Sequence, residues 1–298
     1  MIKNIVISGG GPNGISQLAA IIYFIEKNYL DLKIIQSVYG TSVGAVLGLF
    51  IVLQYDFQII ADFFLKRPWH KVINFDFEDM VLMIQNNGYM DMFIVEDIID
   101  RLLGAVDISK DITFKELYDQ TNTLYCIYGA KVNTFEPIMF SHETYPSLSV
   151  KTALLISCAL PPMFKPILYN GEYYMDGGVF CNYPINDCLE RFPNKQETLG
   201  IQIISNAKLK SFYEDTSMPE YILLCVYKLI LQNQNKLKLN DIQELSIEVK
   251  FKSLDPIVWR NFIDETIRKE MYDTGTQAAK DYLTAQSLET DQVSPDLA

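Results

Sequence analysis

The sequence predicts a layered α/β domain, in which helices cover a sheet that is buried on both faces. The first observation is a chain of 298 residues with 49% hydrophobic and 21% charged residues, which is enough apolar sequence for a large core. The second is that residues 4–25 and 34–55 contain no charged side chain. A polar, glycine-containing turn interrupts each stretch, so both are interpreted as a buried strand, a turn and a helix, and not as transmembrane spans.

Strands and helices are expected to alternate along the chain. Residues 4–8 are predicted as a strand and 15–29 as an apolar helix. A strand over 32–39 is β-branched at three positions, and an apolar helix follows over 45–55. Further helices are expected within 57–120 and over 150–158, 221–234 and 260–283, and further strands over 123–130, 137–140, 173–175, 199–204 and 245–251. The helix over 150–158 must end before Pro161 and Pro162, because proline cannot continue it.

One domain is expected over residues 1–284, with a motif-bearing core at about 4–205, a C-terminal helix and strand part at 206–284 and a flexible polar tail at 285–298. The first apolar run is short and interrupted by glycines, which does not fit a signal peptide. Cysteines stand at positions 126, 158, 181, 188 and 225 without C-x-x-C spacing, so reduced thiols are expected. These features predict an intracellular protein, soluble or peripherally bound to a membrane, and leave its oligomeric state open.

Charge and histidine content exclude several functions. The formal net charge is −12, so the chain lacks the basic surface of nucleic-acid-binding proteins, and no nucleic-acid partner is expected. Contact with a lipid surface would have to be made by apolar side chains. The chain has two histidines, His70 and His142, too few for a multi-histidine metal site. No metal and no other cofactor is expected.

The strongest motif is G-x-S-x-G at residues 40–44, between a predicted strand and a predicted helix. A serine on such a sharp turn is held in a strained conformation, and Gly40 and Gly44 remove side chains that would collide there. The helix that follows directs the positive end of its dipole toward the serine, which favours negative charge on a reacting centre. Ser42 is therefore the candidate nucleophile. The alternative is a glycine-tolerated turn that happens to contain a serine.

A second glycine-rich turn, at residues 9–14, separates the first predicted strand from the first helix. It matches the G-x-G-x-x-G fingerprint, so a nucleotide-binding protein is the rival functional class. That fingerprint requires an acidic residue at the end of the second strand, whereas Asp31 precedes that strand. The favoured interpretation is an oxyanion hole formed by the amides of Gly9, Gly10 and Gly11. Gly10 and Gly11 are the better candidates.

The general base is expected not to be a histidine. His70 and His142 both lie in loop-like sequence and are interpreted as surface residues, and a triad in the usual Ser, acid, His order would need His142 as its base. Asp176 lies at the end of a predicted strand, before Gly177 and Gly178. A carboxylate within hydrogen-bond reach of a serine can accept its proton directly, so Asp176 is the candidate base. A hairpin turn is the alternative, and it is favoured when the Asp-Gly-Gly tripeptide is considered alone.

Together these motifs resemble those of the patatin-like phospholipases, a family of lipid acyl hydrolases with a Ser–Asp dyad. Residues 9–14 (GGGPNG) are similar to the family's glycine-rich oxyanion segment and 40–44 (GTSVG) to its nucleophile elbow. Residues 157–166 (SCALPPMFKP) are similar to its S-x-A-x-P-x-x-F-x-P segment, and residues 176–184 to its D-G-G…N-x-P block. The resemblance covers about residues 4–205.

The resemblance implies a three-layer α/β/α fold with a central, mostly parallel sheet. It also implies a metal-free phospholipase A-type esterase that cleaves fatty-acyl esters through an acyl-enzyme, with Ser42 as nucleophile and Asp176 as general base and acid. The family commonly carries Arg or Lys at the position of Asn13, so weaker anion stabilisation or an altered substrate preference is expected there. A non-catalytic lipid-binding relative is a further alternative, and the intact Ser42 and Asp176 argue against it. The expected supporting positions are Asn13, Gly14, Gly40, Gly44, Gly177 and Gly178.

Residues 69–93 are rich in methionine and aromatic side chains. The set comprises Trp69, Phe75, Phe77, Met80, Met83, Tyr89, Met90, Met92 and Phe93. A lipid-facing lid or channel is one interpretation, because methionine adapts to varied ligands and tryptophan suits an interface. An ordinary core stripe is the favoured interpretation.

Overall fold

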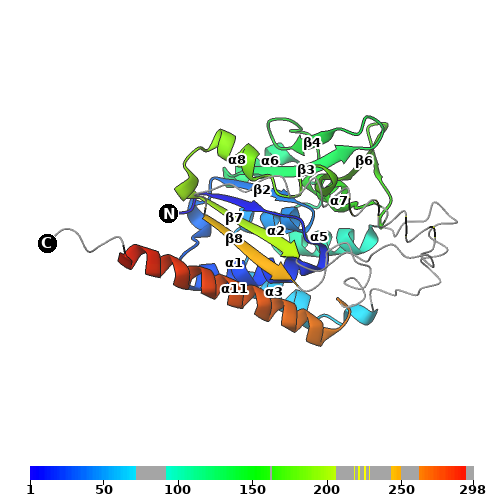
Figure 1. Cartoon of the computed structure of the whole chain (residues 1–298). Coiled ribbons are helices and arrows are strands. Elements are labelled where there is room, and N and C mark those ends of the chain that lie inside the picture. The colour runs from blue at the N-terminus through cyan, green and yellow to red at the C-terminus, as the bar shows by residue number, and fades with distance from the viewer. Residues whose placement is uncertain are drawn as a thin grey trace.

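The computed structural model describes residues 1–71, 92–161, 163–205, 243–249 and 262–292, together with positions 218, 221, 225 and 228. Its centre is an eight-stranded sheet in the order β5-β6-β3-β2-β1-β7-β8, with β4 paired to β3 beside this path (Figure 1). The strands are β1 (Asn4–Ile7), β2 (Ser37–Thr41), β3 (Leu124–Lys131), β4 (Pro137–Phe140), β5 (Ile167–Tyr169), β6 (Glu172–Asp176), β7 (Thr198–Ser205) and β8 (Gln243–Val249).

The sheet is mostly parallel. Strands β3, β2, β1, β7 and β8 run in one direction, whereas β4 and β6 pair with β3 in the antiparallel sense and β5 pairs with β6 in the same way. The carboxyl ends of β1 and β2 therefore meet at one edge of the sheet, where ligand sites of α/β proteins are found. The pairing of Gly129 on β3 with Asp176 on β6 brings the end of β6 to the same edge.

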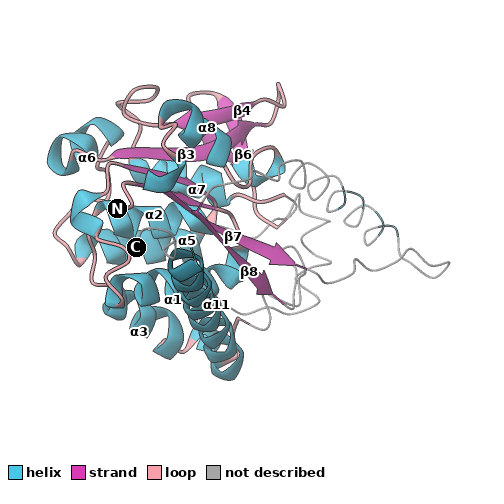
Figure 2. Cartoon of the chain, turned by 60° about the vertical axis from the view of Figure 1, so that its left-hand side comes forward, coloured by secondary structure: helices cyan, strands magenta, loops and turns pink. Residues whose placement is uncertain are grey.

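The helices are α1 (Gly14–Glu26), α2 (Val43–Val52), α3 (Phe57–Lys66), α5 (Phe93–Gly104), α6 (Phe114–Thr121), α7 (Val150–Cys158), α8 (Ile185–Arg191) and α11 (Glu265–Gln292). Short 3₁₀ helices are η1 (Gly11–Asn13), η2 (Leu32–Ile34), η3 (Trp69–Lys71), η4 (Gly177–Val179) and η5 (Lys195–Glu197). Figures 1 and 2 show α11 running along α1, and the Ser16 hydroxyl of α1 donates to the Met271 carbonyl of α11 at 2.7 Å.

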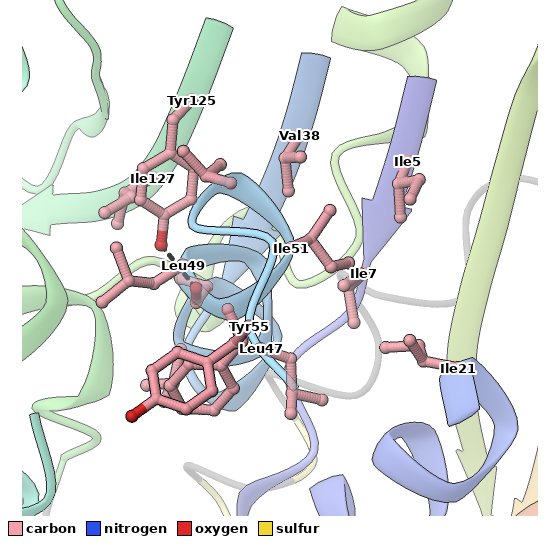
Figure 3. Close-up of a cluster of buried hydrophobic side chains, with 14 of the residues drawn as sticks. Ile5, Ile7, Ile21, Val38, Leu47, Leu49, Ile51, Tyr55, Tyr125 and Ile127 are labelled. Carbon is pink, nitrogen blue, oxygen red and sulfur yellow. Dashed lines mark hydrogen bonds between the residues drawn. The ribbon is translucent and has the colours of Figure 1, made fainter. Parts of the chain in front are cut away.

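The helices bury the two faces of the sheet unequally. The larger core joins Ile5 and Ile7 of β1 to side chains of α1, α2, α7 and α11, whereas Val6 points to the other face and packs with α8. Figure 3 shows the larger core where α2 crosses the strands. There the Tyr125 hydroxyl donates to the Ala45 carbonyl at 2.5 Å, so the one polar group of this side chain is satisfied inside the core. The central sheet between two helical layers confirms the predicted α/β fold.

The two charge-free stretches form strand–turn–helix units, as predicted. The first contains β1, η1 and α1, and the second contains β2 and α2. Their strands and helices are almost entirely buried, which accounts for their lack of charge. Among the described residues, no helix is both long enough and apolar enough to cross a membrane.

Several boundaries differ from the prediction. The strand expected from residue 32 begins at Ser37, because the Asp31 side chain accepts the Lys33 N–H at 3.0 Å and caps η2. Strand β5 and helix α8 were not anticipated. Residues 285–292, expected in a flexible tail, continue α11, where the Gln286 side chain donates to the Tyr282 hydroxyl at 2.8 Å.

Two expectations fall largely on residues that the structure does not describe. The helix over 221–234 lies almost wholly outside the described residues, and so do residues 72–91 of the methionine-rich and aromatic segment. Of that segment, Trp69 is fully buried and its ring stacks on Phe64 and contacts Phe262. Met92 is also buried. These two side chains belong to the core, in line with the favoured interpretation, whereas Phe93, the third described member of the set, is 56% exposed.

Candidate active site

Ser42 occupies the turn between β2 and α2, at the carboxyl edge of the sheet. Its backbone has φ 55° and ψ −129°, a region that residues other than glycine rarely enter. The amide of Ser42 donates to the Ser157 hydroxyl at 2.8 Å, and that hydroxyl donates to the Tyr128 carbonyl at 2.5 Å. The strained turn is thus held by a buried side chain from α7 and a carbonyl of β3. The side chain of Ser42 is half-buried and lies at the N-terminal end of α2.

The glycines around Ser42 allow close approach of backbone to backbone. A Cβ atom on Gly44 would lie 2.4 Å from the Ile7 carbonyl oxygen and 2.5 Å from that of Ser8. A Cβ atom on Gly40 would lie 2.7 Å from Cα of Ala45. The first turn of α2 therefore packs against the end of β1 at a distance that only glycine permits.

Asp176 ends β6 and is 2% exposed. Its Oδ1 accepts the Gly178 N–H at 2.7 Å. Burial raises the pKa of Asp176 from 3.8 to about 7, and the Gly178 N–H and the Ser42 side chain oppose that rise. The fold therefore brings Ser42 and Asp176, far apart in sequence, close enough for the Ser42 side chain to act on the pKa of the carboxyl. The carboxyl is poised to exchange a proton near neutral pH.

The close contact of η4 with β3 holds the Asp176 turn in place. A Cβ atom on Gly177 would lie 2.6 Å from the Tyr128 carbonyl oxygen. One on Gly178 would lie 2.9 Å from Oδ1 of Asn182 and 3.1 Å from Oδ1 of Asp176. The same Tyr128 carbonyl accepts the Ser157 hydroxyl, so the Ser42 and Asp176 turns rest on one point of β3.

The glycine-rich turn passes beside Ser42. A Cβ atom on Gly9 would lie 3.3 Å from the Ser42 Cβ. The Gly9 N–H donates to the Asn182 carbonyl at 3.0 Å, and the Asn182 side chain donates back to the Gly9 carbonyl at 3.2 Å. For the amides of Gly10 and Gly11, no acceptor lies among the described residues. Gly11 has φ 52°, in the left-handed region that suits glycine.

Asn13 and Gly14 lie where this turn enters α1. Asn13 is buried, and its N–H donates to the Gly10 carbonyl at 3.1 Å. A Cβ atom on Gly14 would lie 2.3 Å from Cγ2 of Val43, so the starts of α1 and α2 are in contact beside Ser42. The two glycine-rich turns therefore meet at one site.

Both histidines lie in other surroundings. His142 follows β4, which runs antiparallel to β3 with Phe140 opposite Ile127. The chain at His142 is therefore heading toward the start of β3. Its ring stacks on Tyr118 with centroids 3.7 Å apart, and burial lowers its pKa. His70 is an exposed residue of η3. In the described part of the chain, no three His, Cys, Asp or Glu side chains are grouped so that they could hold a metal ion.

Three contact residues had no role in the sequence-based prediction. Ser157 bonds the Ser42 amide, Asn182 bonds Gly9, and the Cys158 thiol lies near enough to the Ser42 side chain for Ser42 to act on its pKa. Burial raises the pKa of Cys158, so this thiol is neutral. All three residues lie within the two downstream blocks of the resemblance, which were the available signal.

A sheet of this kind with a serine on a sharp strand-to-helix turn is the architecture of α/β hydrolytic enzymes. A family model described as patatin-like phospholipase matches residues 5–189, which is more than half of the chain. The chain therefore belongs to the patatin-like phospholipase family and is a patatin-like lipid hydrolase.

Individual relatives agree with this assignment. "Probable lipid hydrolase 463L" of Invertebrate iridescent virus 6 is 26% identical over 264 residues, which cover 87% of this chain and 85% of that protein. An uncharacterised protein of Acanthamoeba polyphaga mimivirus is 24% identical over 221 residues, covering 72% and 73% of the two chains. The structure of VipD from Legionella pneumophila matches 94% of this chain and 67% of its own, with a TM-score of 0.55 at 16% identity. That likeness supports the shared fold.

Proposed function

We propose that this protein hydrolyses fatty-acyl esters of phospholipids, in the manner of a phospholipase A-type esterase, with a Ser42–Asp176 dyad. The observation that carries the proposal is that the Ser42 turn and the turn after the buried Asp176 pack on the same Tyr128 carbonyl, close enough for the Ser42 side chain to lower the pKa of the carboxyl. A carboxylate with a pKa near 7 can take a proton from serine and return it at neutral pH. No histidine is needed between the two groups, and both histidines lie elsewhere on the fold.

In the first step, Asp176 accepts the proton of the Ser42 hydroxyl while Oγ attacks the ester carbonyl carbon. The carbonyl oxygen becomes an oxyanion in a tetrahedral intermediate. The ester C–O bond then breaks, Asp176 gives its proton to the leaving alcohol, and the acyl group remains on Ser42. The positive φ of Ser42 supports this role because nucleophilic serines on sharp strand-to-helix turns are held in such a strained conformation.

In the second step, Asp176 takes a proton from water, and the resulting hydroxide attacks the acyl carbon. The bond from this carbon to Ser42 Oγ breaks, Oγ recovers the proton, and the fatty acid leaves. One carboxyl thus serves as base and then as acid in each half-reaction. A pKa near the working pH favours both roles.

We expect the oxyanion to lie at the turn of residues 9–11. The Gly10 and Gly11 amides are the proposed donors, since their hydrogens have no acceptor among the described residues. The Gly9 amide, the third member of the expected set, is directed to Asn182 in this structure and anchors the turn against Ser42. Asn13, buried behind the turn, is proposed to support it as a neutral group.

Family membership and the named viral relative support a lipid ester as substrate. The test is product analysis by mass spectrometry after incubation with mixed-chain phosphatidylcholine vesicles and with triglyceride emulsions. The wild type is expected to release fatty acid from the phospholipid, whereas Ser42→Ala should release none above background. Asp187→Asn is a matched carboxylate control, since Asp187 belongs to α8 and accepts the Tyr128 hydroxyl on the face of the sheet that α8 covers. Release by Ser42→Ala at the wild-type rate would overturn the proposal.

Product analysis, vesicle binding and calorimetry together separate the two alternatives. A non-catalytic lipid-binding relative would bind vesicles and release no fatty acid in any form. A nucleotide-binding protein would show NAD or NADP binding by calorimetry. The end of β2 argues against this alternative, because Ser42 follows it where a ribose-binding acid would be needed.

A further inference from the structure

An exposed phenylalanine lies at the turn between β3 and β4. Phe135 is 61% exposed and has φ 56°, in the left-handed region where glycine and asparagine are favoured and bulky residues are outliers. The turn is closed by the Lys131 N–H, which donates to the Glu136 carbonyl at 2.9 Å. Neither burial nor backbone preference accounts for a phenylalanine here. A bulky apolar side chain that is exposed and also sits on a left-handed backbone points to an external contact.

This turn is joined to the candidate active site. The Phe135 ring contacts the Phe180 ring edge-on, with centroids 4.8 Å apart. The Phe180 N–H in turn donates to the Gly177 carbonyl at 2.9 Å, and Gly177 directly follows Asp176. The exposed ring therefore rests on the segment that carries the proposed base.

Two more exposed apolar side chains lie on the neighbouring hairpin. Leu168 of β5 and Tyr173 of β6 are opposite each other in the ladder, so they share one face, and they are 58% and 45% exposed. The Tyr173 carbonyl accepts the Val132 N–H at 2.8 Å, which ties this hairpin to the end of β3. The β3–β4 turn and the β5–β6 hairpin both adjoin the end of β3, and we call their exposed Phe135, Leu168 and Tyr173, with the half-buried Phe180, the hairpin surface. In Figure 1, β4 and β6 lie together on the side of the sheet away from α3 and α11.

We propose that the hairpin surface docks the protein on a lipid surface by inserting apolar side chains, with Phe135 foremost. This inference rests on the proposed function, because a hydrolase of membrane lipids must bring its site to the bilayer. The charges beside the surface do not favour anionic headgroups: Lys131 is paired with Glu172 at 2.9 Å, and the whole chain carries −12. Apolar insertion into zwitterionic lipid fits these charges.

Phe135→Asn tests the proposal without disturbing the fold. Asparagine tolerates the left-handed conformation, so the thermal midpoint should stay the same or rise. Partition to phosphatidylcholine vesicles, measured by flotation, should fall about tenfold because the apolar area of the ring is lost. Hydrolysis of a water-soluble short-chain ester should remain at the wild-type rate. Ile59→Asn is the matched control, since Ile59 is 56% exposed on α3, away from the hairpin surface, and its partition should not change.

Unchanged vesicle partition in Phe135→Asn, an equal loss in Ile59→Asn, or no flotation of the wild type would each overturn the docking proposal. A lowered thermal midpoint with unchanged partition would assign Phe135 to folding and overturn it in the same way. The soluble ester keeps the two proposals apart. If the wild-type protein does not hydrolyse the soluble ester, the dyad proposal is contradicted, whereas the partition measurement reports on docking alone.

Discussion

The Ser42 amide and the Ser157 hydroxyl oxygen lie 2.8 Å apart, and the same hydroxyl donates to the Tyr128 carbonyl of β3. Ser157 is fully buried, and 115 positions separate it from Ser42 in the sequence. The hydroxyl therefore couples the proposed nucleophile turn to β3, the strand against which the turn after Asp176 also packs. Its position makes Ser157 a positioning residue for the proposed reaction.

Ser157→Ala is expected to lower kcat on a soluble ester about ten- to a hundredfold, with KM nearly unchanged, because a displaced nucleophile affects the chemical step. The free energy of unfolding should fall by about 1–3 kcal/mol, since two buried backbone groups lose their partner. Ser157→Thr keeps a hydroxyl and should recover part of kcat. Ser37→Ala removes a buried hydroxyl at the opposite end of β2 from Ser42 and should cost stability only. An unchanged kcat in Ser157→Ala would refute the positioning role.

The pKa of Asp176 predicts an acid limb in the activity profile. Burial raises this pKa to about 7, and only the carboxylate form can accept the Ser42 proton. On a soluble ester, log kcat/KM should rise with pH with a slope of about 1 below pH 7 and level off above it. Stopped-flow or initial-rate assays over this range measure the limb. A profile that is flat from pH 5 to 8 would contradict Asp176 as the base.

The same buried carboxyl should make stability depend on pH. The folded state holds the Asp176 proton up to about pH 7, whereas the ordinary value of 3.8 applies when the chain is unfolded. Its contribution is therefore fully present below pH 4 and lost as pH rises through 7. Asp176→Asn has no such loss and should be more stable than the wild type at pH 8, on the order of 3 kcal/mol. Urea unfolding at pH 4 and 8 measures the difference, which should shrink at pH 4. A difference that is equal at both pH values would contradict the shift.

Gly44→Ala should destabilise the protein by about 2 kcal/mol or more, because its Cβ would meet backbone oxygens of Ile7 and Ser8 that cannot move aside. Gly104→Ala is the matched control. A Cβ atom there meets nothing within 4 Å, at the end of α5, so this variant should be neutral or more stable by about 0.5–1 kcal/mol. Urea midpoints of the two variants give the comparison. Equal midpoints would show that the close approach of α2 to β1 is relaxed in solution.

Much of the fold could be predicted because its signals are local. The continuous apolar runs of β1 and α1 and the prolines after α7 fix these elements within a few residues. The start of β2 could not be predicted from its β-branched residues, since the Asp31 cap on η2 competes with them. Strand β5 is only three residues long and depends on its pairing with β6, which no local pattern reveals.

The candidate site divides in the same way. Ser42 and Asp176 stand out in the sequence because their turns need glycine at fixed spacing, and the structure packs the two turns on the same carbonyl of β3. Ser157 and Asn182 gain their contacts only when distant segments fold together. The Gly9 amide, directed to Asn182, is a further contact that spacing alone does not reveal.

The central claim is that Ser42 is the nucleophile and Asp176 its base, and covalent labelling tests it most directly. Wild type, Ser42→Ala and Asp176→Asn are treated with a long-chain fluorophosphonate, and the labelled peptide is identified by mass spectrometry. The account predicts a single label on Ser42 in the wild type, none in Ser42→Ala, and a rate at least about a hundredfold lower in Asp176→Asn. Labelling at another residue, or labelling of Asp176→Asn at the wild-type rate, would contradict it.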